Sequence, residues 1–407
     1  METTLFTQST AMEPMLPESS RPALAELTSE ILRKAGRLSA QVPSPIIRRK
    51  VARLVLEMNS YYSNLIEGHK TLPRDIERAL KHNYSANPEQ RANQHLTRAH
   101  IEVETLMAER LEKESMLSVQ SPEFIGWLHR EFYARLPEEL HFGIDRKGQK
   151  YRIEPGALRS FEVDVGSHQP PHFGALPQML ARFASFYESD RILETEQLIA
   201  LAAAHHRLAW IHPFGDGNGR VARLHSQAWL IRCKADGQGL WTLSRGLARE
   251  RQEYYQKLSS ADSQRRSDLD GRGNLSDRAL GEFCLFFLRA MLDQIEFMGG
   301  LLQLHDLSTR IERYLQFEVL NLKTRDQERL GRLLKAALFE GEIARGRVGE
   351  IVGLRGTAAR GIVRLTVREG LLESQTERGP LSLVFSAKTL ESYFPQLYQP
   401  LAIETGS

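Results

Sequence analysis

The sequence predicts a mainly α-helical protein with a small β-hairpin, followed by a separate C-terminal module that combines helices with a second hairpin. Along most of the chain, apolar residues recur at three- and four-residue steps, which is the spacing of amphipathic helices. Short alternating stretches, which indicate strands, occur only near residue 163 and in the last forty residues. Together these patterns place most of the chain in helices.

The composition is that of a globular protein. Of the 407 residues, 41% are hydrophobic and 26% are charged, which excludes disordered and fibrous classes. The length indicates two or three domains. With only Cys233 and Cys284, no disulfide framework is expected, and a reducing, cytoplasmic location is predicted. No signal peptide, membrane span or membrane contact is expected, and a net charge of +3 does not indicate nucleic-acid binding by the chain as a whole.

The N-terminal third is predicted to be helical after a loose arm at residues 1–22. Ser44 is a suitable N-cap with Pro45 at the first helical position, and the amphipathic helix that follows ends at Gly68. We expect further helices over 24–37, 85–138, 177–187, 194–210, 220–234, 244–260 and 276–305. In the alternating run, Phe161, Val163 and Val165 share one side, which predicts a strand with one wet face.

The last hundred residues predict a winged helix-turn-helix domain. Helices are expected over 327–340, 348–352 and 357–369, and strands over 371–376 and 381–385, which is the element order of that domain. Three arginines fall at four-residue steps along the third helix and form one basic stripe: Arg360, Arg364 and Arg368. Such a stripe is suited to DNA contact, although it is also compatible with a solvated face or with a domain that binds proteins.

One segment combines the groups needed for phosphate chemistry, running from His212 to Arg223. Its glycines permit a tight turn into a helix, where unpaired N–H groups and the helix dipole attract an anion. Arg220 and Arg223 lie on nearly one face of that helix and add a phosphate-binding pair. Asp216 offers an oxygen ligand to Mg²⁺, and His212 is able to take a proton from a hydroxyl group. The pattern indicates metal-assisted nucleotidyl or phosphoryl transfer, to a protein or to a small molecule.

This segment, HPFGDGNGRVAR, closely resembles the signature of the Fic family, whose members mostly transfer AMP from ATP to a hydroxyl group of a target protein. The resemblance implies that His212 is the general base, that Phe214 anchors the loop in the core and that Asp216 holds Mg²⁺. It further implies an ATP- and phosphate-binding loop, with Arg223 at the γ-phosphate; the loop residues are Gly215, Gly217, Asn218, Gly219, Arg220 and Arg223.

A second resemblance lies upstream of the loop. SNLIEG, residues 63–68, is similar to the inhibitory helix motif that many Fic proteins carry. The resemblance implies that Glu67 pairs with Arg223 and occupies the γ-phosphate site, while Ser63 helps to hold the helix, and an Arg–carboxylate pair competes directly with phosphate. The alternative is an ordinary helix C-terminus with an exposed Glu.

Two weaker resemblances concern the surroundings of the loop. Residues 155–166 look like the Fic flap, a β-hairpin that pairs with an extended target segment, which would make Val163 and Val165 docking residues. Leu158 stands where the family has an aromatic residue, and a hairpin without a partner is the alternative. Tyr254 and Tyr255 are similar to an aromatic pair near the adenine, although tyrosines on a helix also belong to cores.

These observations define the expected organisation. We expect an N-terminal helical region over 1–95 with the inhibitory helix at about 45–68, a Fic-fold catalytic domain over 96–305, and the winged helix over 306–407. The expected partners are ATP with Mg²⁺ and a protein target modified on Tyr, Thr or Ser, which includes the chain itself. DNA is an expected partner of the C-terminal domain, and the sequence leaves open whether the chain forms a homodimer. Two other functions are compatible with the sequence: a DNA-binding regulator with a nucleotide-sensing Fic domain, or removal of AMP by the same site, with Glu67 positioning a water.

Overall fold

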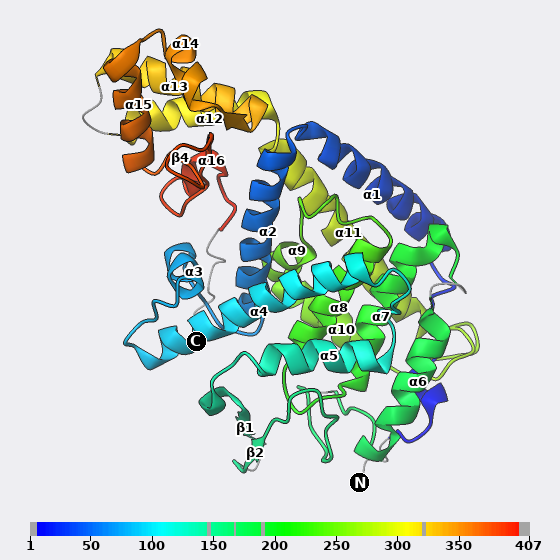
Figure 1. Ribbon diagram of the computed structural model, residues 1–407. Coiled ribbons are helices and arrows are strands. Elements are labelled where there is room, and N and C mark those ends of the chain that lie inside the picture. Colours follow the sequence, from blue (N-terminus) through cyan, green and yellow to red (C-terminus); the bar gives the residue numbers. More distant parts are fainter. Residues whose placement is uncertain (1–5, 145–147, 167, 189–191, 320–322, 399–407) are drawn as a thin grey trace, which may run out of the picture. The chain divides into compact units, whose positions relative to one another are not determined.

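The computed structural model describes residues 6–144, 148–166, 168–188, 192–319 and 323–398 (Figure 1). The chain divides into two compact units. The first contains the residues up to Lys34, Asn59–Asp236 and Thr242–Gln294, and the second contains Ala35–Met58, Gly237–Trp241 and the residues from Ile295 onward. Within the described residues, every helix is too short or too polar to cross a lipid bilayer.

Helices build almost all of the first unit, as the sequence predicts. Helices α1, Arg21–Gln41, α2, Pro45–Ile66, and α11, Asp277–Leu301, each contribute residues to both units. The remaining α-helices of the first unit are α3 Pro73–Leu80, α4 Pro88–Lys113, α5 Pro122–Tyr133, α6 Leu176–Tyr187, α7 Gln197–Ile211, α8 Asn218–Arg232, α9 Leu243–Arg249 and α10 Arg251–Ala261. Short 3-10 turns are η1 Ser9–Met12, η2 Glu138–Leu140, η3 Phe173–Ala175 and η5 Glu194–Glu196.

Two buried helices, α7 and α8, form the centre of the first unit (Figure 1). Helix α6 packs on α7, while α4 and α5 pack on α8, so both central helices are covered on nearly every side. A helix that is covered all round needs no polar face, which is why α7 is rich in alanine and leucine. The turn between α7 and α8 is residues 212–217, which places the phosphate-binding sequence at the middle of the unit.

The expectation of a loose N-terminal arm is wrong for residues 6–20. Met12 and Met15 are buried, and the Tyr187 hydroxyl donates to the Met15 carbonyl. The fully buried Arg207 of α7 donates to the Pro14 carbonyl through Nε at 3.1 Å and Nη2 at 2.8 Å. The arm is held because a buried guanidinium needs acceptors, and a segment without secondary structure has free carbonyls to offer.

The strand predicted at Phe161, Val163 and Val165 is absent, and the hairpin lies earlier in the chain. It consists of β1, Phe142–Ile144, and β2, Lys150–Arg152, with Phe142 opposite Arg152. Between residues 153 and 166 the described backbone makes one isolated bridge, from Val165 to His168. One carbonyl of this segment is taken by a side chain, because Arg159 donates to the Phe161 carbonyl, and Arg159 also donates to the Pro171 carbonyl beyond the segment.

The second unit ends in a helical module with a three-stranded antiparallel sheet of order β3-β5-β4. The predicted helices and strands lie close to their expected positions. The structure adds one strand and two α-helices that the sequence patterns did not predict: a strand after the first predicted helix, and a helix at each end of the module. The elements are α12 Leu304–Phe317, α13 Thr324–Glu340, β3 Glu342–Ile343, η6 Arg345–Arg347, α14 Val348–Val352, α15 Gly356–Arg368, β4 Leu372–Glu373, β5 Leu381–Leu383 and α16 Leu390–Tyr393.

Candidate active site

The loop between α7 and α8 begins with a strained residue. His212 caps α7 in the left-handed conformation, with φ 49° and ψ 61°, which costs a residue other than glycine about 1 kcal/mol or more. Gly217 is also left-handed, with φ 79°, and a Cβ there would lie 2.9 Å from the Tyr133 ring. The sharp turn after α7 therefore depends on glycine at position 217.

The tautomer of His212 follows from one hydrogen bond. Nδ1 lies 3.3 Å from the Ala209 carbonyl oxygen, which only accepts, so Nδ1 carries the proton and Nε2 keeps its lone pair. Burial, reinforced by the nearby His168, lowers the pKa of His212 to about 4. The imidazole is thus neutral at pH 7 and able to accept a proton at Nε2.

Asn218 and Phe214 give the loop its shape. The Asn218 side chain accepts from the Phe214 N–H at 2.9 Å and donates to the Phe214 carbonyl at 2.8 Å. The Phe214 ring is fully buried and stacks on His129 of α5, with ring centroids 4.0 Å apart. The position of Phe214 agrees with its predicted role as an anchor. Because the Asn218 amide is occupied within the loop, this residue has its main-chain N–H to offer a phosphate.

Asp216 is exposed and is held from helix α5. The Tyr133 hydroxyl donates to its Oδ2 at 2.8 Å, and the His129 Nε2 lies 3.2 Å from its carbonyl oxygen. Partial loss of water around the carboxylate would raise the pKa of Asp216. The positive charge of Arg220 and the hydrogen bond from Tyr133 have the larger effect, so the pKa is lowered. The carboxylate is therefore ionised at neutral pH and points out of the loop.

Arg159 joins the predicted flap segment to the loop. Its Nε donates to the His212 carbonyl at 2.9 Å, and its backbone N–H donates to the Pro213 carbonyl at 2.9 Å. Val163 is half-buried and Val165 is 37% exposed in the irregular segment that follows. The segment thus lies against the catalytic loop, although it lacks the hairpin that the sequence predicts there.

The C-terminal end of α2 contacts Arg223, as the inhibitory-helix resemblance implies. Nη2 of Arg223 lies 2.6 Å from Glu67 Oε1 and also donates to the Ser63 carbonyl at 2.9 Å, while Nε donates to Ser63 Oγ at 2.9 Å. Burial would raise the pKa of Glu67, but the charges of Arg223 and Arg220 lower it. The Glu67 carboxylate is therefore ionised and paired with Arg223, the arginine that the resemblance assigns to the γ-phosphate.

Gly219 allows this pairing. A Cβ at position 219 would lie 2.3 Å from Glu67 Oε1, so only glycine lets the carboxylate approach the first turn of α8. The absence of a side chain at position 219 also suits phosphate binding, because a phosphate must come close to the N–H groups at a helix N-terminus in order to accept hydrogen bonds from them. Glu67 therefore lies where the anion of a bound nucleotide is expected.

The two tyrosines predicted near the adenine occupy different environments. Tyr254 is 3% exposed, and its hydroxyl lies 2.7 Å from His205 Nε2 inside the core. Tyr255 is 42% exposed and donates to the Ile66 carbonyl at 3.1 Å, at the end of α2. Tyr255 is thus the member of the pair with a ring surface open to a ligand.

Sequence reasoning missed several residues that shape the loop. They are Asn64, His129, Tyr133, Tyr151 and Arg159; Tyr151, for example, donates to the Gly215 carbonyl at 2.9 Å. The sequence does not mark these residues as partners of the loop, because each reaches it through tertiary packing from another part of the chain. Only Arg159 and Asn64 fell within segments that the sequence analysis singled out.

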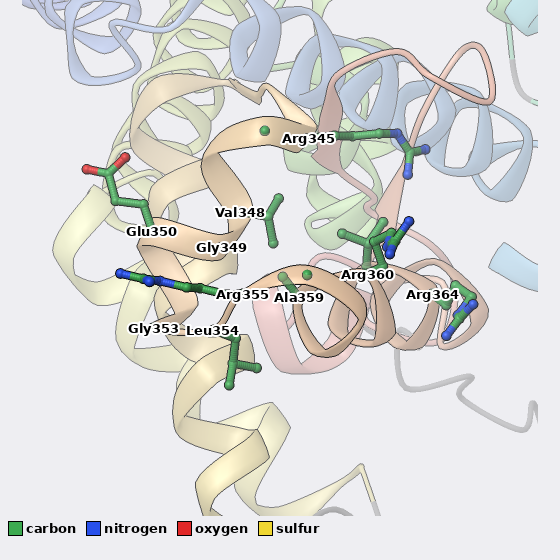
Figure 2. Close-up of a pocket in the computed structure, with 13 residues that line it drawn as sticks. Arg345, Val348, Gly349, Glu350, Gly353, Leu354, Arg355, Ala359, Arg360 and Arg364 are labelled. Carbon is green, nitrogen blue, oxygen red and sulfur yellow. The ribbon is translucent and has the colours of Figure 1, made fainter.

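Two of the three residues predicted to contact DNA line a groove of the second unit, formed by η6, α14 and α15 (Figure 2). Figure 2 shows Arg345, Arg360 and Arg364 directed to one side of the groove, with Arg355 and Glu350 directed to the other. Arg360 and Arg364 are exposed. Arg368 is exposed as well, but it donates to Glu369 and does not line the groove. The groove therefore combines two arginines of the predicted stripe with two further arginines, Arg345 and Arg355, and one glutamate, Glu350.

The model of the Fic/DOC family matches residues 119–230. Residues 119–230 are a Fic/DOC family domain. This Fic domain contains α5 to most of α8 and therefore the whole catalytic loop.

Curated relatives of this Fic domain match over short stretches. "Protein adenylyltransferase Fic" of Drosophila erecta is 41% identical over 94 residues, which is 23% of this chain and 19% of that protein. The protein of the same name from Culex quinquefasciatus is 38% identical over 80 residues, which is 20% of this chain and 16% of that protein. The chain thus spans about a fifth of the length of the curated relatives it matches.

A solved structure resembles a larger part of the chain. A Fic family protein from Desulfovibrio desulfuricans G20 has a TM-score of 0.52 and 18% sequence identity, and the match covers 91% of this chain and 98% of that one. At this identity the likeness supports the fold alone.

Proposed function

We propose that the Fic domain is a protein adenylyltransferase that transfers AMP from ATP to a Tyr, Thr or Ser hydroxyl of a target protein, with this chain itself among the candidate targets. The observation that carries the proposal is the placement of a neutral His212, protonated at Nδ1, six residues before the start of α8, whose N-terminal part bears Arg220 and Arg223. The partial matches to proteins named protein adenylyltransferase Fic in Drosophila erecta and Culex quinquefasciatus support the same activity.

The chemistry assigned to these residues is a single displacement. The target hydroxyl oxygen attacks the α-phosphorus while Nε2 of His212 takes its proton. The bond from the α-phosphorus to the bridging oxygen breaks, and pyrophosphate leaves. The first N–H groups of α8 and the Arg220 guanidinium stabilise the phosphate oxygens, because they are positive groups fixed in place before ATP arrives.

Mg²⁺ fits this site through Asp216. Among the described residues, no group of three or more His, Cys, Asp or Glu side chains is arranged to hold a metal ion, so a cation here would take its other ligands from phosphate and water. One exposed, ionised carboxylate oriented by Tyr133 suits that ligand set. When bound, Mg²⁺ would supply positive charge to the phosphates.

We propose that the Glu67–Arg223 pair keeps the enzyme inactive. The γ-phosphate of ATP and the Glu67 carboxylate would both bind the Arg223 guanidinium, and two anions that share one guanidinium repel each other. ATP that cannot reach Arg223 is held with its α-phosphate out of line with the hydroxyl. Loss of the carboxylate at position 67 should therefore activate transfer.

Labelled-nucleotide transfer by Glu67→Gly and wild-type protein tests the proposal. We expect label from ATP on the chain itself or on an added protein extract to rise about tenfold or more in Glu67→Gly. Glu67→Gly combined with His212→Ala should lose the label and still bind ATP. UTP, GTP and CTP reveal nucleotide preference, and mass spectrometry locates the modified hydroxyl. Equal labelling by both proteins would contradict autoinhibition, and Glu67-dependent loss of pre-attached AMP would favour the removal reaction.

We also propose that the C-terminal module is a winged helix-turn-helix that contacts DNA. The basic groove supports this proposal, because Arg360 and Arg364 project from the longest helix at its rim. A double charge reversal, Arg360→Glu with Arg364→Glu, should abolish salt-sensitive binding of a short DNA duplex in an anisotropy measurement. Arg368→Glu, outside the groove and bonded to Glu369, should cause a smaller loss. Binding that is unchanged in the double variant would leave a protein partner as the alternative.

A further inference from the structure

Asn64, the residue after Ser63 in α2, is bonded to the first arginine of the catalytic loop. Its Oδ1 accepts from Arg220 Nε at 3.0 Å, across 156 positions of sequence, and its side chain is fully buried. The Asn64 Nδ2 donates to the Ser60 carbonyl at 3.0 Å. This second bond determines which end of the amide faces Arg220, because only the nitrogen is able to donate.

Arg220 is held on a second side by an aromatic ring. The centre of its guanidinium lies 5.5 Å from the centroid of the Phe132 ring, and the residue is only 5% exposed. The hydrogen bond from Nε to Asn64 and the contact of one face with the Phe132 ring together fix the orientation of the Arg220 guanidinium plane. Its two terminal nitrogens are then the donors that it presents to a phosphate.

Glu67 and Asn64 differ in how easily they are displaced. Glu67 lies just beyond the last residue of α2, and its side chain is 28% exposed. Asn64 lies within the helix, and its helix neighbour Ser60 donates to the Thr97 carbonyl of α4 at 2.8 Å. A local movement therefore suffices to remove Glu67 from Arg223, whereas removing Asn64 from Arg220 requires the end of α2 to leave α4.

We propose that Asn64 is a positioning residue for AMP transfer, which orients Arg220 toward the phosphates of ATP. The inference rests on the proposed adenylyltransferase function. It gives the end of α2 two opposed roles, since Glu67 blocks the nucleotide while Asn64 completes the site that uses it. Activation must then displace Glu67 and leave the last turns of α2 in place.

The test compares variants of Asn64 in the activated Glu67→Gly protein. Asn64→Leu has nearly the same shape and no acceptor, whereas Asn64→Asp keeps an acceptor for Arg220 Nε. Ser60→Ala is the matched control, because it removes a buried hydrogen bond of the same helix that does not involve an arginine. For each protein, kcat and the KM for ATP are measured with the melting temperature, and the Kd for ATP with Mg²⁺ is measured by calorimetry without any target.

We expect Asn64→Leu to lower kcat/KM about tenfold or more, as for the loss of a hydrogen bond to a charged group, and Ser60→Ala to stay within about twofold. Asn64→Asp should keep kcat and raise the KM for ATP, because its carboxylate orients Arg220 but repels phosphate. Transfer by Asn64→Leu that equals or exceeds that of the Glu67→Gly parent would overturn the proposal. So would a loss of kcat in Asn64→Asp as large as in Asn64→Leu.

ATP affinity keeps this inference separate from the proposed function. If the Glu67→Gly protein transfers no AMP, the proposed function fails, while the calorimetry still measures whether Asn64→Leu weakens ATP binding about tenfold. Unchanged ATP affinity in that case contradicts a positioning role for Asn64. Should Asn64→Leu fail to fold, Asn64→Ser, whose oxygen is too close to the helix to reach Arg220, takes its place in both measurements.

Discussion

Arg223 Nη2 lies 2.6 Å from Glu67 Oε1, although 156 positions of sequence separate the two residues. The same guanidinium donates to both oxygens of Ser63, so one arginine is bonded three times to the end of α2. Arg223 is 3% exposed, and a buried guanidinium without acceptors would cost several kcal/mol. The pair therefore stabilises the arrangement of α2 in which we propose that the enzyme is inactive.

Replacing Ser63 with alanine should activate the enzyme partially. The variant removes the Oγ acceptor of Arg223 Nε and leaves the Ser63 carbonyl and Glu67 in place. We expect AMP transfer to rise about threefold to tenfold, less than in Glu67→Gly, because one of several bonds to a charged group is lost. The control Ser60→Ala should label at the wild-type level. If Ser63→Ala also labels at the wild-type level, the Ser63 Oγ plays no part in inhibition.

The pH dependence of transfer should reflect the shifted pKa of His212. Burial lowers this pKa to about 4, so the base stays unprotonated as the pH falls through 6.5 and gains a proton only near pH 4. We therefore expect the kcat of Glu67→Gly to change less than about twofold between pH 7.5 and pH 5.5. Circular dichroism at each pH verifies that the protein remains folded. A decline centred near pH 6.5 would mean that His212 is not the group that accepts the proton.

The buried Glu104 should destabilise the fold at alkaline pH. Burial raises the pKa of Glu104 to about 8, although the Asn59 amide, 2.6 Å away, partly opposes the shift. Between pH 4.5 and 8 the unfolded state releases this proton and the folded state keeps it, so the free energy of unfolding falls as the pH rises. We expect Glu104→Gln to raise Tm by about 3 °C or more at pH 8 and to leave it unchanged at pH 4.5. The exposed Glu109→Gln on the same helix serves as the control, and an equal Tm change at both pH values would argue against the shift.

The N-terminal arm should contribute to stability. Met15 is 1% exposed, and its carbonyl accepts from the Tyr187 hydroxyl. Truncating its side chain in Met15→Ala should cost about 2–5 kcal/mol, as for other buried methionines, and lower the midpoint of urea unfolding. Gln8→Ala, at an exposed position of the arm, should leave the midpoint unchanged. If both variants unfold alike, the arm does not pack in solution.

Sequence patterns located the helices well, because amphipathic periodicity and caps act over a few residues. Pro45 begins α2 as the sequence predicts, and the short helix α14 occupies the predicted residues 348–352. The flap strand was wrong because the alternation of Phe161, Val163 and Val165 is only a local preference. In the folded chain, Arg159 donates to the Phe161 carbonyl, which a strand would have offered to a neighbouring strand.

The sequence by itself predicted the loop from His212 to Arg223 and the pairing of Glu67 with Arg223, because the residue types of both motifs recur at close spacing. Only the tertiary structure determined which residues far apart in the sequence contact each other. Asn64 reaches Arg220, Tyr133 reaches Asp216 and the N-terminal arm reaches Arg207 across long stretches of sequence. These contacts exist because buried charges require acceptors, and packing determines which distant groups are close enough to supply them.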